Sequence, residues 1–133
     1  MPGPSTGADA WIAKAENDLL CIENNLASKS IPWDVVVFHS QQVAEKYLKA
    51  VLAAAGRPIP KIHDLVTLLK ECAKVSPGLI SQKEDCRGLT RYGSVSRYPE
   101  NEFDMGRDEA LSMVEAARRV REAVRAVLPS LSS

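Results

Sequence analysis

Arginines and tyrosines near residue 95 stand at a spacing that could recognise a nucleic acid. Residues 91–99 read R-Y-G-S-V-S-R-Y-P, so two Arg-Tyr pairs occur in a short span, the second formed by Arg97 and Tyr98. A guanidinium can hold a phosphate through two parallel hydrogen bonds, and a tyrosine ring can stack on a base. Equally, Arg97 could pair with an acid such as Glu45 while Tyr98 packs on the protein. The two interpretations are weighted evenly.

A histidine, a glutamine and a lysine form a second candidate group. His39, Gln42 and Lys46 share one face of a predicted helix with Lys49. RNA cleavage without a metal needs a base that takes the 2′-hydroxyl proton and a cation that stabilises the developing charge. His39 could be that base and meet Arg97 across a dimer. The alternatives are an ordinary interface histidine and a solvated strip of lysines.

Composition narrows the function classes. Lys and Arg total 17 and so do Asp and Glu, which argues against a surface that follows nucleic acid over its whole extent. The chain contains no GxGxxG or P-loop string, so any nucleotide site must be built from side chains between helices. The first residues have no basic region followed by an apolar stretch, and no apolar run has membrane-spanning length, so we expect neither a signal peptide nor a membrane span. We expect a cytoplasmic protein with three reduced cysteines, no cofactor and no metal site.

Helical spacing of apolar residues recurs along the chain, and no stretch alternates with period two. This predicts an all-α, up-and-down antiparallel bundle of four to five helices. The expected helices are 9–28 with Asp9 as N-cap, 33–55 ending at Gly56, a short one capped by His63 or Asp64, one from about Leu79 to Tyr92, and 105–128 ended by Pro129. The expected single domain covers 9–128, between a disordered segment 1–8 and a tail 129–133.

Two features do not follow the simple amphipathic pattern. Gln41 falls on the apolar side of its helix, so we expect a buried or interfacial amide that needs partners. Arg118, Arg121 and Arg125 form a strip on the last helix. Solvation and a favourable interaction with the helix dipole explain this strip more simply than a nucleic-acid contact does.

Four short motifs together resemble one family. Residues 38–50 read F-H-S-Q-Q-V-A-E-K-Y-L-K-A, residues 59–65 read I-P-K-I-H-D-L, and residues 96–99 read S-R-Y-P. The first helix opens with Trp11, Ala15, Asp18 and Leu19. In this order and at these positions the motifs resemble HEPN domains, over about residues 9–128. Each motif alone would be weak, and the specificity comes from the combination.

The resemblance implies a helical bundle that usually forms homodimers and has a proposed nucleotide-binding role. It further implies frequent pairing with a minimal nucleotidyltransferase in toxin–antitoxin-like modules. Many similar domains are metal-independent ribonucleases with an Arg-x4–6-His motif near the start of the last helix. This chain departs from that motif, since none of residues 98–103 after Arg97 is a histidine. Arg57 and His63 have the spacing, but they straddle the wrong loop.

The sequence therefore favours a module that binds nucleotide or RNA and a nucleotidyltransferase partner, with enzyme activity left open and not favoured. The residues expected to contact a ligand are His39, Gln42, Lys46, Arg97 and Tyr98. One alternative is a ribonuclease toxin with a rearranged site that uses His39 and Arg97. Another is a non-catalytic helical adaptor in which every motif serves the fold.

Overall fold

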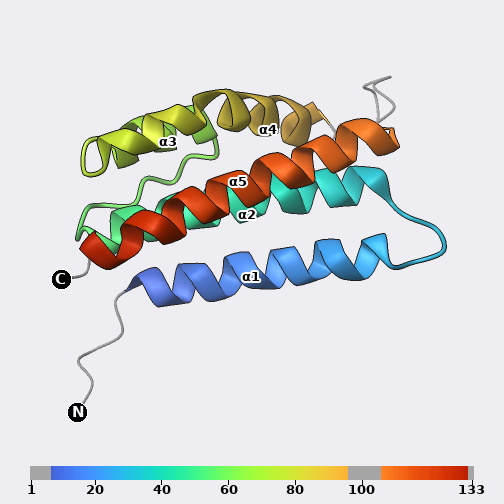
Figure 1. The fold of residues 1–133 in the computed structure, drawn as a ribbon, viewed down its shortest axis with the longest axis horizontal. Helices are drawn as coiled ribbons and strands as arrows, with labels where there is room; N and C mark the ends of the chain where they lie inside the picture. The colour runs from blue at the N-terminus through green and yellow to red at the C-terminus, as the bar shows by residue number, and fades with distance from the viewer. Residues whose placement is uncertain (1–6, 96–105, 132–133) are drawn as a thin grey trace, which may run out of the picture.

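The structure, a computed structural model, describes residues 7–95 and 106–131. Five α-helices and one 3-10 helix occur there: α1 (Gly7–Leu26), α2 (Trp33–Ala54), α3 (Leu65–Ala73), η1 (Pro77–Gln82), α4 (Lys83–Val95) and α5 (Arg107–Leu131). These ranges contain no β-strand. The prediction of an all-α helical bundle is confirmed (Figure 1).

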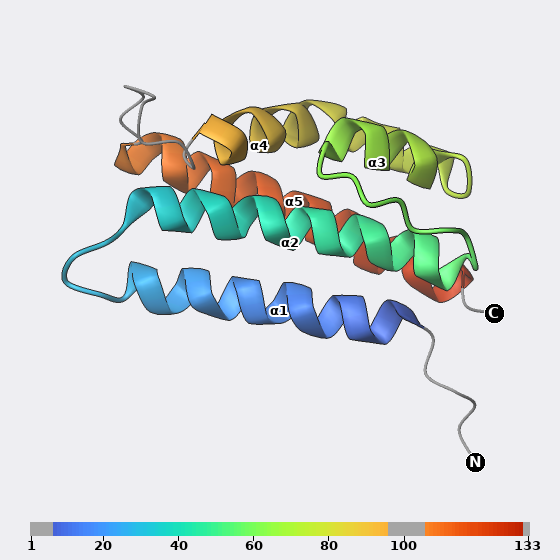
Figure 2. The same cartoon turned by 180° about the vertical axis from the view of Figure 1, so that it is seen from behind.

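The second helix occupies the centre of the bundle. α1 lies antiparallel along one side of α2, and α5 with the α3–α4 pair covers the others (Figures 1 and 2). The extended connection after α2 returns along the bundle, so α3 runs in the same direction as α2 (Figure 2). Consequently α2 carries many of the fully buried side chains, among them Val37, Val43, Tyr47, Leu48 and Val51.

This arrangement contradicts the alternative in which the lysines of α2 form a solvated strip. Lys49 is only 6% exposed, and His39, Gln42 and Lys46 are partly buried. The spacing of residues within α2 cannot show that α1 covers the polar side of α2. Charged groups covered in this way need partners within the protein.

Local signals placed several helix ends correctly. Gly56 follows α2 with a φ of 67°, a left-handed conformation that glycine adopts without a steric penalty. Asp64 caps α3, because its Oδ1 accepts a hydrogen bond from the backbone N–H of Val66 at 3.0 Å. Its Oδ2 accepts a second bond, from the Thr67 hydroxyl at 3.1 Å.

The ends of the first and last helices differ from the prediction. α1 begins at Gly7, so Asp9 lies in its first turn and is not the N-cap. Residues 7 and 8 of the expected disordered segment thus belong to α1, and residues 1–6 lie outside the described part. Pro129 is inside α5 and does not end it. A proline one turn from a helix end removes a single hydrogen bond, and Leu131 still packs against the core.

The fourth predicted helix has two parts. The 3-10 helix η1 precedes α4, and α4 extends to Val95, beyond the end expected near Tyr92. Residues 93–95, which follow the predicted end of this helix, are therefore helical, and residues 96–105 lie outside the described residues.

The three cysteines are free of disulfides. Cys21 is exposed, whereas Cys72 and Cys86 are buried, and burial raises the pKa of each buried thiol to about 12. The two buried thiols therefore behave as small apolar groups of the core. No helix of the described part of the chain is long and apolar enough to cross a membrane.

The central position of α2 leads to a prediction about stability. Leu48→Ala removes a fully buried side chain and should lower the free energy of unfolding by about 3 kcal/mol. The matched control is Leu20→Ala on α1, since Leu20 is 53% exposed; its effect should stay within about 0.5 kcal/mol. Urea denaturation of both variants checks this, and equal midpoints would contradict the central burial of α2.

Candidate functional site

Asp18 on α1 connects two of the predicted site residues on α2. Its Oδ1 lies 2.7 Å from Nδ1 of His39, and its Oδ2 accepts a hydrogen bond from Nζ of Lys46. His39 and Lys46 are seven residues apart in one helix, so both point toward α1. The structure thus brings His39 and Lys46 together through an acid of another helix. We call Asp18, His39 and Lys46 the Asp18 cluster.

The Asp18 cluster lies at the edge of the protein and is not in its core. The side chains of His39 and Lys46 are 23% and 21% exposed, whereas that of Asp18 is 10% exposed. Within the described residues, no hydrogen bond engages Nε2 of His39. A carboxylate that accepts from Nδ1–H fixes the tautomer in which Nε2 is an acceptor. Such a ring can accept a proton or, when protonated, donate to a phosphate oxygen.

Gln42, on the same helix as His39 and Lys46, belongs to a second group of polar residues that includes Gln41 and Glu45. Its Nε2 donates to Oε1 of Gln41 at 2.7 Å. Gln41 in turn donates to Oε1 of Glu45 at 3.1 Å and to the backbone carbonyl of His63 at 3.3 Å. The prediction that Gln41 is a buried amide with several partners is confirmed, since the residue is 7% exposed.

Glu45 is the centre of this second group. Its Oε1 lies 3.0 Å from Nδ1 of His63, and its Oε2 accepts from Nζ of Lys49 at 3.2 Å. The Glu45 and Lys49 side chains are 5% and 8% exposed. Nζ of Lys49 also lies 5.3 Å from the ring centroid of Trp11, a cation–π contact. These pairings assign the group to the fold, because it joins α1, α2 and the start of α3.

Arg97 and Tyr98 lie outside the described residues, so their roles stay predictions. The neighbouring Arg-Tyr pair is described: the guanidinium of Arg91 lies 5.8 Å from the ring centroid of Tyr92. Tyr92 is partly buried and packs against the core. Tyr92 therefore contributes to the packing of α4 on the core.

The arginines of the α5 strip are paired with groups of other helices, although Arg118 and Arg125 are also exposed to solvent. Nε and Nη2 of Arg121 donate to the two oxygens of Glu16 on α1, at 2.9 and 3.0 Å. Glu16 also accepts from the Tyr47 hydroxyl at 2.6 Å, and Arg125 donates to that hydroxyl at 3.3 Å. Arg118 lies 3.7 Å from Glu23. The strip therefore links α5 to α1 and α2. The sequence pattern of one helix cannot indicate such contacts between helices.

These contacts perturb the titration of Glu16 and its partners. Hydrogen bonds from Arg121 hold the pKa of Glu16 at about 2, and those from the Tyr47 hydroxyl act in the same direction. The Glu16 carboxylate raises the pKa of Arg121. Burial and the bond to Glu16 raise the pKa of Tyr47. All three groups stay in one protonation state near neutral pH, which suits a structural connection.

Sequence reasoning did not single out Asp18 as a site residue. The signal was present in the sequence, because Asp18 interrupts the apolar stripe of α1 between Ala15 and Ile22. In the structure the residue as a whole is 7% exposed. A buried carboxylate requires a cationic or hydrogen-bonding partner. Its partners lie 21 and 28 residues away, so a helical pattern alone could not name them.

The family model described as the HEPN domain matches residues 8–127. The chain belongs to the HEPN family. Neither a search of curated proteins nor a search of solved structures found a match. At the level of the family, the match supports a module related to nucleotides or RNA.

The HEPN domain shows no metal-binding geometry in its described part. No group of three or more His, Cys, Asp and Glu side chains within residues 7–95 and 106–131 could hold a metal ion. The string Arg57-x5-His63 does not form a site either. His63 contacts Glu45, whereas Arg57 lines a pocket that His63 does not reach.

The buried position of Glu45 leads to a test of its structural role. Glu45→Gln leaves Lys49 buried without a counter-charge and should lower the free energy of unfolding by about 3 kcal/mol. The matched control is Glu84→Gln, since Glu84 is 79% exposed in its pair with Arg87; its effect should be within about 0.5 kcal/mol. Thermal denaturation of both variants measures the difference. Full stability of Glu45→Gln would contradict the structural role of Glu45.

The lowered pKa of Glu16 predicts a pH dependence. Its folded-state pKa of about 2 is below the ordinary 4.5, so its contribution is complete well above pH 4.5 and is lost as the pH falls toward 2. More than a third of the side chain is exposed, so solvent screening limits this contribution to about 1 kcal/mol. Glu16→Gln should be less stable than wild type at pH 6 and approach it near pH 2.

Urea midpoints across that pH range provide the measurement. Glu23→Gln on the same helix is the control, because Glu23 makes only the 3.7 Å pair with Arg118. It should reproduce the wild-type curve. A constant difference between Glu16→Gln and wild type at every pH would rule out the linkage.

Proposed function

We propose that this HEPN domain binds a nucleotide or RNA at the edge between α1 and α2 and acts with a minimal nucleotidyltransferase in a toxin–antitoxin-like pair. The observation that carries the proposal is the Asp18 cluster. It presents Nε2 of His39 and the partly exposed amine of Lys46 side by side on an otherwise closely packed bundle. Gln42 lies on the same face, between them in sequence.

The charge of the cluster limits how it can bind an anion. The Asp18 carboxylate neutralises Lys46, and the whole chain has a formal net charge of zero. The cluster therefore attracts phosphate through directed hydrogen bonds more than through a long-range field. Because Asp18 already neutralises Lys46, binding of an anionic ligand requires a further cation at the site. Arg97 is the residue that we propose for this role, with Tyr98 stacking on a base.

The course of the chain is compatible with this role of Arg97. α4 ends at Val95 and α5 begins at Arg107. Both of these ends lie at the same end of the bundle as the start of α2, which leads to His39 (Figure 1). We further propose that two copies pair as a homodimer, so that this end of one protomer can contribute to the site of the other. The predicted cytoplasmic location stays a prediction.

One observation favours a second function, the metal-independent ribonuclease. The 2.7 Å contact with Asp18 orients His39 as an acceptor at Nε2, the arrangement a general base requires. In that alternative, Arg97 supplies the cation that stabilises the developing charge on the phosphate. The non-catalytic adaptor is the remaining alternative, and it predicts no affinity for RNA.

Binding of a fluorescent single-stranded RNA, followed by anisotropy at low salt, tests the proposal. His39→Ala, Lys46→Gln and Arg97→Ala should each weaken binding about tenfold, an energy of about 1.4 kcal/mol. Lys70→Gln is the control with the same change of charge, because Lys70 is exposed on α3 and outside the cluster. It should bind as the wild type does.

The same samples separate the alternatives. Gel analysis of the RNA after incubation detects cleavage, and cleavage that His39→Ala abolishes would favour the ribonuclease. Thermal melting of each variant controls for misfolding. Equal affinity of wild type and all three site variants, or no affinity in any of them, would contradict a nucleic-acid site at the Asp18 cluster.

A further inference from the structure

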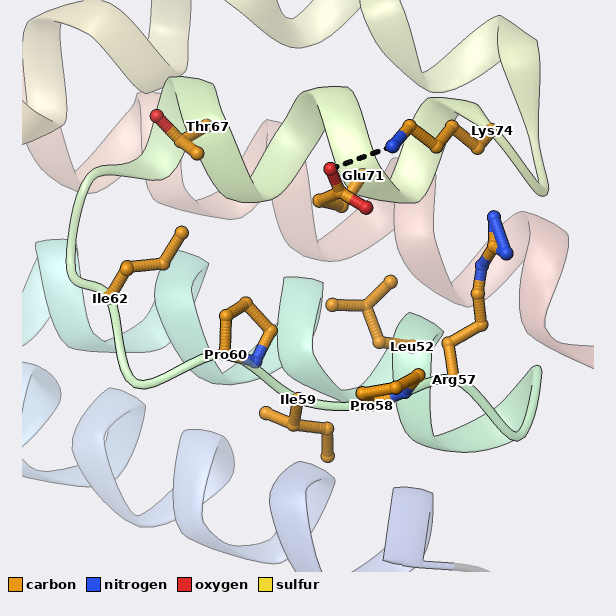
Figure 3. A pocket seen from close by; sticks show the side chains of 9 residues that line it. All are labelled: Leu52, Arg57, Pro58, Ile59, Pro60, Ile62, Thr67, Glu71 and Lys74. Carbon is orange, nitrogen blue, oxygen red and sulfur yellow. Dashed lines mark hydrogen bonds and ion pairs between the residues drawn. The ribbon is translucent and has the colours of Figure 1, made fainter.

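A pocket lies on the side of α2 that faces away from α1. The connection after α2 and the helix α3 enclose a volume of about 370 Å³ (Figure 3). Leu52 is buried, whereas Pro58, Thr67 and Lys74 are exposed, so the pocket extends from the core to the surface. A volume of this size is within the range of small-molecule sites. Nothing in the proposed function uses this pocket.

Its walls are of two kinds. Five of the nine residues that line it are apolar: Leu52, Pro58, Ile59, Pro60 and Ile62. The polar ones are Arg57, Thr67, Glu71 and Lys74. Figure 3 shows Arg57 extending from the end of α2 toward the part of α3 that carries Glu71 and Lys74. No aromatic residue lines the pocket, so a stacked base is not the expected occupant.

Arg57 is the unusual member of this lining. Its Nε is buried, and no group of the described residues accepts a hydrogen bond from it. The side chain also forms no ion pair with any described acid, unlike Arg87, Arg119 and Arg121. Arg57 as a whole is only partly buried, but a buried N–H without an acceptor is unfavourable. A carboxylate can satisfy a guanidinium through two parallel hydrogen bonds.

The charges of the lining limit the ligand further. Nζ of Lys74 pairs with Oε1 of Glu71 at 2.9 Å (Figure 3), so these two charges cancel. The Thr67 hydroxyl already donates to Asp64. Arg57 therefore leaves the pocket with one net positive charge. One net positive charge matches a monoanion, and Glu71 would repel a second negative charge nearby.

We propose that this pocket binds a small organic carboxylate: a single carboxylate group on Arg57, with an aliphatic body against Leu52, Pro60 and Ile62. The apolar walls provide the burial that holds the body of such a molecule. The arginine decides the charge and the position of its polar end. The site is distinct from the Asp18 cluster, which lies where α2 meets α1.

Two-dimensional ¹H–¹⁵N NMR of the full chain tests this, since a buried Nε–H of arginine gives its own resonance. Titration with hexanoate or cyclohexanecarboxylate into the millimolar range should shift the Arg57 Nε–H signal and the amides of Ile59, Ile62 and Thr67. Arg57→Gln should weaken binding at least about tenfold, because it removes the bidentate donor. Arg57→Lys keeps the charge, loses the planar donor and should also bind more weakly.

Three further ligands separate the contribution of the carboxylate charge from that of the aliphatic body. Hexanol lacks the charge and acetate lacks the aliphatic body, so both should bind more weakly than hexanoate. Hexyl phosphate carries a charge of about −1.5 to −2 at pH 7 and should bind more weakly to the wild type, with part of the loss recovered in Glu71→Gln. Lys70→Gln on the same helix is the control and should leave hexanoate binding unchanged.

Two results would overturn the inference. One is the absence of shifts at the pocket for every carboxylate, and the other is equal affinity of wild type and Arg57→Gln. Tighter binding of hexyl phosphate than of hexanoate would overturn the assignment to a monoanion. Arg57→Gln should leave RNA affinity unchanged, so a failure here is distinguishable from a failure of the proposed function.

Discussion

Because α2 is surrounded by other helices, the buried and partly buried polar side chains along it need partners inside the bundle. Three carboxylates meet this need in different ways. Glu45 accepts a hydrogen bond from Lys49 in the core, and Asp18 on α1 contacts His39 and Lys46. Glu16, also on α1, accepts a hydrogen bond from the Tyr47 hydroxyl. The positions of α1 and α5 relative to α2 therefore depend on these ion pairs as well as on apolar packing.

The three polar groups differ in exposure, and exposure decides which of them can meet a ligand. In the Glu45 group the acid and the lysine are both less than a tenth exposed, so of this group only the side chain of His63, which is 72% exposed, faces solvent. The Glu16 group is committed to Arg121 through two hydrogen bonds. Only the Asp18 cluster, among the groups of the described residues that contact α2, combines a buried acid with a partly exposed histidine and lysine. A buried acid that orients surface groups is a common way to prepare a binding site.

The two proposed sites lie on different sides of the central helix. The Asp18 cluster is where α2 meets α1, and the carboxylate pocket is where the chain leaves α2 and begins α3. Each site depends on one charged residue. Asp18 finds its partners on another helix, and Nε of Arg57 finds no acceptor among the described residues. A charged side chain at a buried or half-buried position identified both.

The sequence by itself determined the local structure, because helix period and end signals are encoded within a few residues. The extents of α2 and α3, the glycine after α2, the Asp64 cap and the buried Gln41 were all predictable in this way. Tertiary structure alone decided the partners. Arg121 meets Glu16 across 105 residues and His39 meets Asp18 across 21, and no periodic pattern specifies which helices become neighbours. The arginine strip therefore connects α5 with α1 and α2, and the polar face of α2 carries the site that we propose.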